Sequence, residues 1–268
     1  MKVAAVQMTS GPDVAANLSS ARDLLAAAAK AGARLAVLPE NFAFIGLEDA
    51  DKRAVGEPEG SGPIQDFLAQ AARSLGLWIV GGTIPLKVPR EGRVAAASLL
   101  LDDRGRVVAR YDKIHLFDVD IPGRQESYRE SANISPGKEP IVVDTPAGKL
   151  GLTVCYDLRF PELFRRLSAA GAELVSVPAA FTAPTGRAHW ETLLRARAIE
   201  NLSYVIASAQ SGLHLNGRET YGDTLVADYW GRVLRRRPRG RGVVVCDTDP
   251  AGQAEARAVF PALRHRVM

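Results

Sequence analysis

The sequence predicts a single α/β domain, covering residues 1–268, in which two β-sheets pack face to face with helices outside. Strand-like apolar segments alternate with helical segments along the whole chain, and no linker or low-complexity segment divides it. In addition, 31–44 (AGARLAVLPENFAF) is similar to 170–183 (AGAELVSVPAAFTA): each follows a helix and is an apolar strand ending in proline, with a phenylalanine three residues later. The similarity favours two related halves, although buried helix–strand joints in general share this composition.

Helix and strand ends are recognisable in the first half of the chain. Asp13 is a suitable N-cap and Gly32 a suitable C-cap for the first helix. An apolar strand stops at Pro39, which leaves Glu40 at its carboxyl end. The predicted helices are 13–32 and 62–75, and the predicted strands are 2–8, 34–40, 77–84, 95–101 and 106–113, the last two forming a hairpin.

The second half repeats the alternation after a hairpin with a glycine in its turn. The basic run RRRPRGRG, residues 235–242, is predicted to be a solvated hairpin between two late strands rather than a nucleic-acid patch. The predicted strands are 140–144, 149–155, 173–179, 203–210, 223–229 and 242–248, and the predicted helices are 161–170, 187–201 and a short one at the end.

Composition excludes several classes of protein. No apolar run reaches the roughly 18 residues of a membrane span, and the N-terminus lacks a signal-peptide pattern. A net charge of +4 on 268 residues does not indicate nucleic-acid binding. The only cysteines, Cys155 and Cys246, are not expected to form a disulfide in a reducing compartment. We therefore expect a cytoplasmic protein that binds neither membranes nor nucleic acids.

Cys155 stands where an apolar strand gives way to the charged segment YDLRFPEL. A structural cysteine usually lies inside a strand, and Cys246 in VVVCD fits that pattern. In α/β folds, ligands gather at the carboxyl ends of strands, and a strand-to-helix turn places backbone N–H groups beside a sulfur atom there. Cys155 is therefore a candidate nucleophile, and packing of a small apolar side chain remains the alternative.

A cysteine nucleophile needs a base or a cation nearby to activate it. None of the histidines lies in a catalytic signature, and the sequence contains no metal-ligand spacing, serine-hydrolase elbow or nucleotide-binding motif. Glu40 and Lys113 both follow predicted strands, where each alone would be an ordinary solvated charge. Together with Cys155 they supply a base, a cation and a nucleophile. Neither a metal nor another cofactor is expected.

The motifs around these residues resemble those of the nitrilase superfamily of carbon–nitrogen hydrolases. The segments LPENF, YDKIHLFDVD, YRESANISPG and GLTVCYDLRFPEL carry the resemblance, which extends over essentially the full chain. The resemblance implies a four-layer α-β-β-α sandwich, a homodimer or higher homo-oligomer, and a Glu-Lys-Cys triad. It assigns Glu40 as general base, Lys113 as oxyanion stabiliser and Cys155 as nucleophile, with Glu130 positioning the lysine and the substrate.

The resemblance also implies a mechanism through a thioester. Glu40 takes the thiol proton, Cys155 attacks an amide carbonyl, and the Lys113 ammonium and the backbone N–H of Tyr156 bind the oxyanion. Glu40 then protonates the departing amine and activates the water that hydrolyses the thioester. Glu130 beside Glu40 would raise a carboxyl pKa by repulsion unless Lys113 lies between the two.

Two later segments, YRESANISPG and PAAFTAPTGRAHWETLLRARAIENLSYVIASAQ, look most like the deaminated glutathione amidase branch. That branch splits deaminated glutathione into 2-oxoglutarate and cysteinylglycine, and the matching positions for the oxo-acid end are Arg159, Phe181 and Thr185. Arg159 can bind a carboxylate through two parallel hydrogen bonds. A salt bridge from Arg159 to Asp157 or Glu162, and core packing of Phe181, are the structural alternatives. Asp157 and Glu162 are expected to hold the turn rather than to react.

Other functions remain possible at this stage. The same chemistry would serve an ω-amidase acting on 2-oxoglutaramate, or a hydrolase of another small carboxylated amide. A non-catalytic scaffold with this fold is the third possibility, but such proteins usually lack a triad member, and Glu40, Lys113 and Cys155 are all present.

Overall fold

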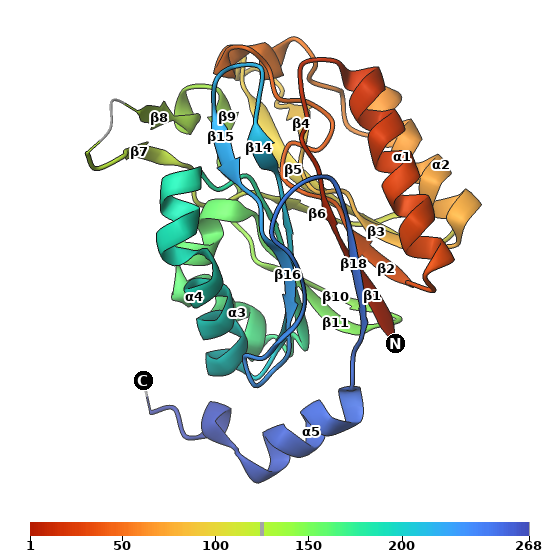
Figure 1. Cartoon of the computed structure of the whole chain (residues 1–268), viewed down its shortest axis with the longest axis vertical. Coiled ribbons are helices and arrows are strands. Elements are labelled where there is room, and N and C mark those ends of the chain that lie inside the picture. Colours follow the sequence, from red (N-terminus) through yellow and green to blue (C-terminus); the bar gives the residue numbers. More distant parts are fainter. Residues whose placement is uncertain (124–125, 268) are drawn as a thin grey trace.

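The computed structural model of the chain, which describes residues 1–123 and 126–267, has two facing β-sheets between two pairs of helices (Figure 1). Helices α1 and α2 cover the outer face of one sheet, and α3 and α4 cover the outer face of the other. This arrangement confirms the predicted α-β-β-α sandwich. The helices are α1 (Val14–Lys30), α2 (Pro63–Leu75), α3 (Pro161–Ala169), α4 (Ala183–Asn201) and the C-terminal α5 (Pro250–Val259).

Each sheet contains a parallel centre with antiparallel strands at its edges. The first sheet has the order β18 (Gly242–Asp247), β1 (Lys2–Gln7), β2 (Leu35–Val37), β3 (Trp78–Val80), β5 (Val94–Leu101) and β4 (Ile84–Lys87), and β6 (Val107–Asp112) and β9 (Ile134–Ser135) also pair with β5. The second has the order β10 (Ile141–Thr145), β11 (Gly148–Leu152), β12 (Leu174–Ala179), β13 (Tyr204–Ala209), β16 (Thr224–Ala227) and β17 (Val233–Arg237).

Short elements occupy the ends of the sandwich. Two hairpins stand apart from the main sheets, and one-turn 3₁₀ helices follow several strands. The hairpins are β7 (Asp118–Asp120) with β8 (Ser127–Arg129) and β14 (Ser211–Leu213) with β15 (Glu219–Tyr221), and the 3₁₀ helices are η1 (Asp49–Arg53), η2 (Glu130–Ala132), η3 (Cys155–Arg159) and η4 (Ala262–Arg264). Within the described residues, no helix is long and apolar enough to cross a membrane.

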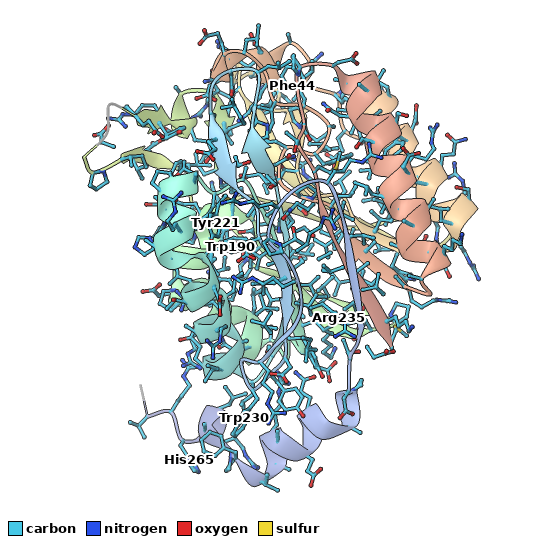
Figure 2. All side chains as sticks on the ribbon, in the orientation of Figure 1. Phe44, Trp190, Tyr221, Trp230, Arg235 and His265 are labelled. Carbon is cyan, nitrogen blue, oxygen red and sulfur yellow. The ribbon has the colours of Figure 1, made fainter. Side chains whose placement is uncertain are left out.

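Alternation of side chains along β1 shows how the layers are held together. Val3 and Ala5 belong to the larger core, which contains residues of both sheets and of α3 and α4. Ala4 and Val6 belong to a second core between the first sheet and α1 and α2. Because successive side chains of a strand point to opposite faces, one apolar strand can contribute to both cores. Figure 2 shows that side chains fill the space between the layers.

The two similar sequence segments form equivalent joints. Segment 31–44 links α1 to β2, and segment 170–183 links α3 to β12. Gly32 (φ +87°) and Gly171 (φ +92°) both have left-handed backbones just after the helix, and each N–H donates to the carbonyl oxygen three residues earlier. In both halves, three neighbouring parallel strands alternate with two helices: β1-α1-β2-α2-β3 and β11-α3-β12-α4-β13. The repeated joint therefore reflects a repeated βαβαβ unit.

The strand predicted over 77–84 is wrong, because the chain forms two strands there. β3 ends at Val80. β4 begins at Ile84 and pairs antiparallel with β5. Gly82 lies between them with φ +52°, and a Cβ atom there would lie only 2.0 Å from the carbonyl oxygen of Pro39. Only glycine fits both this left-handed backbone and this close approach to Pro39. The break between β3 and β4 therefore also fixes the segment that leads to Glu40.

β12 ends at Ala179 as predicted, and it continues through Pro178 because β11 has already left the sheet and no hydrogen bond to it is lost. Two other features differ from expectation. Helix α4 begins at Ala183 rather than residue 187, since Pro184 is tolerated in its first turn. The basic run 235–242 is solvated as expected but is not a hairpin, because β17 belongs to the second sheet and β18 to the first.

Candidate active site

The structure brings the predicted triad and Glu130 together in one pocket. Glu40 follows β2 of the first sheet, and Lys113 follows β6 directly. Glu130 opens η2, and Cys155 opens η3 after β11 of the second sheet. The site therefore lies where both sheets end, and each sheet contributes reacting side chains.

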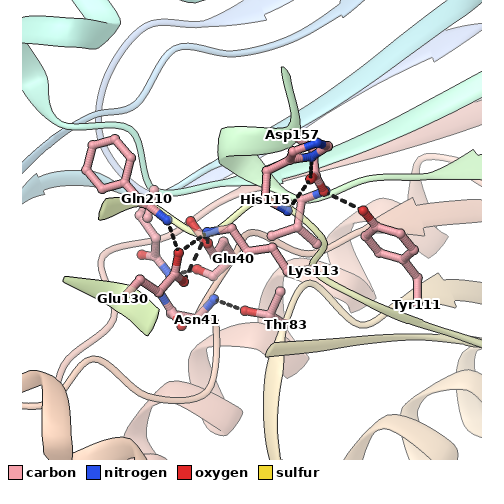
Figure 3. A network of polar contacts seen from close by, with 12 residues as sticks. Glu40, Asn41, Thr83, Tyr111, Lys113, His115, Glu130, Asp157 and Gln210 are labelled. Atoms are coloured by element: carbon pink, nitrogen blue, oxygen red, sulfur yellow. Dashed lines mark hydrogen bonds and ion pairs between the residues drawn. The ribbon is translucent and has the colours of Figure 1, made fainter. Parts of the chain in front are cut away.

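Lys113 lies between the two carboxylates (Figure 3). Its Nζ is 2.9 Å from Oε1 of Glu40 and 2.7 and 3.0 Å from the two carboxylate oxygens of Glu130. The backbone N–H of Phe117 donates to the same carboxylate of Glu130 at 2.7 Å and fixes its orientation. Lys113 is only 1% exposed, so water does not screen these contacts. The cation therefore separates two negative groups that would otherwise repel each other.

The surroundings determine the resting protonation of the site. Burial alone would raise the pKa of Glu40, but the Lys113 ammonium and a hydrogen bond from the Cys155 thiol outweigh it and hold this pKa below its usual value. Burial alone would lower the pKa of Lys113, but Glu130 and Glu40 hold it well above its usual value. Burial and the charge of Glu40 raise the pKa of Cys155 well above its usual value. The resting site thus holds a thiol, a carboxylate and an ammonium.

Backbone contacts fix the loop that carries Glu40. The side-chain amide of Gln210 donates to the backbone carbonyl of Glu40 at 3.0 Å and to the hydroxyl of Ser10 at 2.8 Å. The backbone N–H of Asn41 donates to the Thr83 hydroxyl at 2.8 Å (Figure 3). Asn41 itself has a left-handed backbone, with φ +56°. Residues from three separate segments therefore hold the position of the Glu40 carboxylate.

The turn at Cys155 has the form expected of a nucleophile. The preceding strand ends at Leu152, earlier than predicted, and Cys155 begins η3 with φ +50°, a region that non-glycine residues rarely adopt. The backbone N–H of Ala180 donates a hydrogen bond to its sulfur. By contrast, Cys246 lies inside β18 among core residues, as predicted.

Asp157 holds this turn with a buried network. Its Oδ2 accepts hydrogen bonds from the Tyr111 hydroxyl at 2.6 Å and the backbone N–H of Val154 at 2.8 Å. Its Oδ1 is 3.1 Å from the backbone nitrogen and 2.7 Å from Nδ1 of His115. Asp157 itself is fully buried, and its contacts with Tyr111 and Val154 are made away from water, whereas the His115 side chain is 26% exposed. The network joins η3 to the segment that carries Lys113, in keeping with the structural role expected of Asp157.

Arg159 lies in the pocket without a carboxylate partner among the described residues. The predicted alternative, a salt bridge to Asp157 or Glu162, is absent from the structure. Instead, its Nη1 donates to Nδ1 of His189 at 3.2 Å, and its guanidinium lies 5.2 Å from the centre of the Phe181 ring. Burial lowers the pKa of Arg159, which is the expected effect on a cation that lacks a nearby anion.

Phe181, Thr185 and Tyr156 also line the pocket. Phe181 packs against Trp190 in the core with ring centres 4.9 Å apart, and its ring also faces Arg159. Thr185 lies in the first turn of α4, where its hydroxyl is 2.8 Å from the hydroxyl of Thr182. The sites predicted from the sequence are thus all found in one place, and their roles with substrate remain predictions.

Further lining residues were not singled out in the sequence. They come from η1, the β7–β8 hairpin, the end of η2 and the β14–β15 hairpin, whose position over the sheet ends has no signal in local sequence. They include Asp49, Lys52, Tyr128, Asn133 and Arg218. Tyr128 and Asn133 lie within the YRESANISPG motif, which is the only signal that would have located any of them. Among residues 1–123 and 126–267, no group of three or more His, Cys, Asp or Glu side chains is placed to hold a metal ion.

Comparison with known proteins gives matches over nearly the whole chain. The family model described as carbon-nitrogen hydrolase matches residues 2–258. A protein of Yersinia enterocolitica named deaminated glutathione amidase is 43% identical over 265 residues, which represent 98% of this chain and 92% of that relative.

Solved structures show the same fold with related sequences. The NitFhit protein of Caenorhabditis elegans has a TM-score of 0.91 and 38% identity, and the match covers 99% of this chain and 65% of that one. An amidase mutant from Nesterenkonia sp. AN1 has a TM-score of 0.80 and 30% identity, and the match covers 97% of this chain and 98% of that one. In that amidase, acrylamide has added to the active-site cysteine.

We predict that iodoacetamide labels Cys155 at least about tenfold faster than Cys246. Burial raises the pKa of both thiols, that of Cys246 to about 11, so a difference in resting thiolate does not favour Cys155. Access from the pocket and the adjacent Glu40 carboxylate do favour it. Mass spectrometry of peptides sampled over time measures both rates, and Cys155→Ser should abolish the fast reaction. Faster labelling of Cys246 would refute the assignment of the nucleophile.

Asp157→Asn should lower the free energy of unfolding by about 3 kcal/mol, because an amide N–H group would face buried donors. Tyr111→Phe removes only one donor from the same network and should cost about 1 kcal/mol. Urea unfolding of both variants measures the difference. Equal losses would show that the Asp157 carboxylate does not organise the turn.

Proposed function

The chain belongs to the carbon–nitrogen hydrolase family, and we propose that it is an amidase that splits deaminated glutathione into 2-oxoglutarate and cysteinylglycine. One observation carries the proposal: Cys155, Glu40 and Lys113 meet in a pocket that also contains Arg159, a cation without a carboxylate partner among the described residues. Cys155, Glu40 and Lys113 supply the nucleophile, base and cation that cleave an amide, and Arg159 supplies a binding site for a carboxylate. The name of the Yersinia relative supports the choice of substrate.

Cleavage begins with transfer of the thiol proton. Because the pKa of Cys155 is raised while that of Glu40 is lowered, the thiolate does not accumulate before substrate binds. The proton passes to Glu40 as the sulfur attacks the carbonyl carbon, and the negative charge moves to the carbonyl oxygen. The Lys113 ammonium and the backbone N–H of Tyr156 stabilise that oxyanion.

The lysine keeps its charge throughout this step. When Glu40 becomes protonated, the carboxylate of Glu130 still lies 2.7 Å from the Lys113 ammonium. The oxyanion collapses and the carbon–nitrogen bond breaks, while Glu40 returns its proton to the departing amine. Glu40 then deprotonates a water molecule, which attacks the thioester and releases the acid and the free thiol.

The acyl part of the substrate is held by the residues beside η3. Arg159 binds the carboxylate next to the oxo group through two parallel hydrogen bonds, which a desolvated guanidinium favours. Phe181 and Thr185 form the wall of this subsite. An ω-amidase acting on 2-oxoglutaramate is the alternative, because that substrate carries the same oxo acid. A non-catalytic scaffold would not need the buried triad that the structure contains.

The proposal is tested by comparing kcat/KM for deaminated glutathione, 2-oxoglutaramate, an N-carbamoyl amino acid and a simple nitrile. We expect deaminated glutathione to be the best substrate and Cys155→Ala to abolish its turnover. Arg159→Lys should lower kcat/KM for the oxo acids by about 30- to 1000-fold and have little effect on a neutral amide of similar size.

Either of two results would contradict this assignment. Preference for the carbamoyl compound or the nitrile would exclude the proposed substrate class. If Arg159→Lys lowers kcat/KM equally for acidic and neutral amides, Arg159 does not bind the carboxylate of the substrate. Thermal unfolding of the variant must accompany the kinetics, because the contact with His189 also contributes to packing.

We further propose that the enzyme is a homodimer or a higher homo-oligomer and carries out metabolite repair in the cytoplasm. Trp230 and Phe260 support pairing, because these two aromatic side chains are 49% and 53% exposed and their ring centres lie 5.7 Å apart, which makes an exposed apolar pair. Figure 2 shows Trp230 on the side of the molecule where α5 lies. Two free cysteines agree with a reducing compartment. Light scattering should give at least twice the mass of a 28.7 kDa chain, and Trp230→Glu should weaken the assembly. A monomer at micromolar concentration would refute pairing.

A further inference from the structure

Arg218 is a second pocket arginine without a carboxylate partner in the described part of the chain. It directly precedes β15 in the β14–β15 hairpin. Its Nη2 donates to the backbone carbonyl of Ala180, and its guanidinium lies 5.1 Å from the centre of the Tyr128 ring. Its Nε is buried and has no hydrogen-bond partner. Asp49 lines the same pocket but forms no ion pair with it.

Such an arrangement is costly unless an anion completes it. A buried N–H without a partner loses its hydration without compensation, and a guanidinium is built to donate to two oxygens at once. Other arginines of this chain show the usual solution. Arg236 makes ion pairs with Asp223 at 2.5 Å and Glu191 at 2.9 Å, and Arg197 pairs with Glu200 at 2.9 Å. Arg218 therefore lacks the counter-ion that its setting requires.

The two pocket arginines lie on different elements. Arg159 ends η3, the turn that Cys155 begins. Arg218 belongs to the β14–β15 hairpin and lies over the ring of Tyr128 in β8. They also contact neighbouring residues of one segment, since Arg159 lies over Phe181 and Arg218 binds the carbonyl of Ala180. The pocket thus presents two guanidinium groups on separate elements, and because Arg159 is proposed to hold the carboxylate of the acyl part, Arg218 is left for a second carboxylate.

We propose that Arg218 binds a carboxylate on the leaving group, so that the pocket selects amides with an acid on both sides of the scissile bond. This inference rests on the proposed amidase function and makes its substrate class more specific. Deaminated glutathione has such a carboxylate at the end of its cysteinylglycine part. The leaving group of 2-oxoglutaramate is ammonia, which offers Arg218 nothing to bind.

The test is the ratio of kcat/KM for deaminated glutathione to kcat/KM for 2-oxoglutaramate. In Arg218→Gln this ratio should fall by roughly 10- to 200-fold, the effect of losing hydrogen bonds to a charged group. Arg187→Gln, an exposed arginine on α4, is the matched control and should leave the ratio unchanged. The kcat/KM of the wild-type enzyme should fall by a similar factor when the terminal carboxylate of deaminated glutathione is replaced by an amide. With that analogue, Arg218→Gln should have the same kcat/KM as the wild-type enzyme.

The outcomes separate this role from the proposed function. Wild-type enzyme that cleaves deaminated glutathione and its terminal amide equally well would overturn the role of Arg218 alone. A folded Arg218→Gln protein whose kcat/KM falls equally for deaminated glutathione and 2-oxoglutaramate would also overturn the role of Arg218. Cleavage of 2-oxoglutaramate without cleavage of either peptide amide would contradict both proposals. The substrate comparison with wild-type enzyme remains decisive if Arg218→Gln fails to fold.

Discussion

The buried contact of the Lys113 ammonium with the carboxylates of Glu40 and Glu130 is the interaction on which the site depends. Three charges lie close together with little access to water, and none of them would be tolerated there alone. The Lys113 ammonium lowers the pKa of the buried Glu40 carboxyl, so Glu40 rests as a carboxylate that has a free site for a proton. In the proposed mechanism, the contact of Glu130 with Lys113 persists during proton transfer and keeps the positive charge available for the oxyanion.

The surrounding fold fixes these charges from independent directions. Glu40 depends on Gln210 and on the glycine break after β3, whereas Cys155 depends on the Asp157 network. Each of these supports lies on a different element, and the contacts are buried. A buried network with satisfied hydrogen bonds restricts its members to one arrangement, which a reaction requiring near-contact geometry needs.

Chemistry and selectivity use separate parts of the pocket. In the triad and Glu130, the single ammonium of Lys113 is held by two carboxylates, so these residues present no free cation to an incoming acid. Arg159 and Arg218 pack on aromatic rings and lack acidic partners among the described residues. Aromatic faces stabilise a guanidinium without occupying its hydrogen-bond donors. Both arginines therefore remain available to carboxylates of a substrate.

The sequence by itself determined the α/β class, the approximate positions of the main helices and of most strands of the two sheets, the repeated joint and the contrast between Cys155 and Cys246. These features depend on local periodicity, on caps such as Asp13 and on motif residues, all of which are short-range properties. Only the tertiary structure decided that Lys113 separates Glu40 from Glu130, that β17 and β18 belong to different sheets, and that Arg159 and Arg218 lack acidic partners in the described chain. The reason is physical: periodicity shows which face of a strand is buried, but which strand ends and hairpins meet depends on pairing between distant segments.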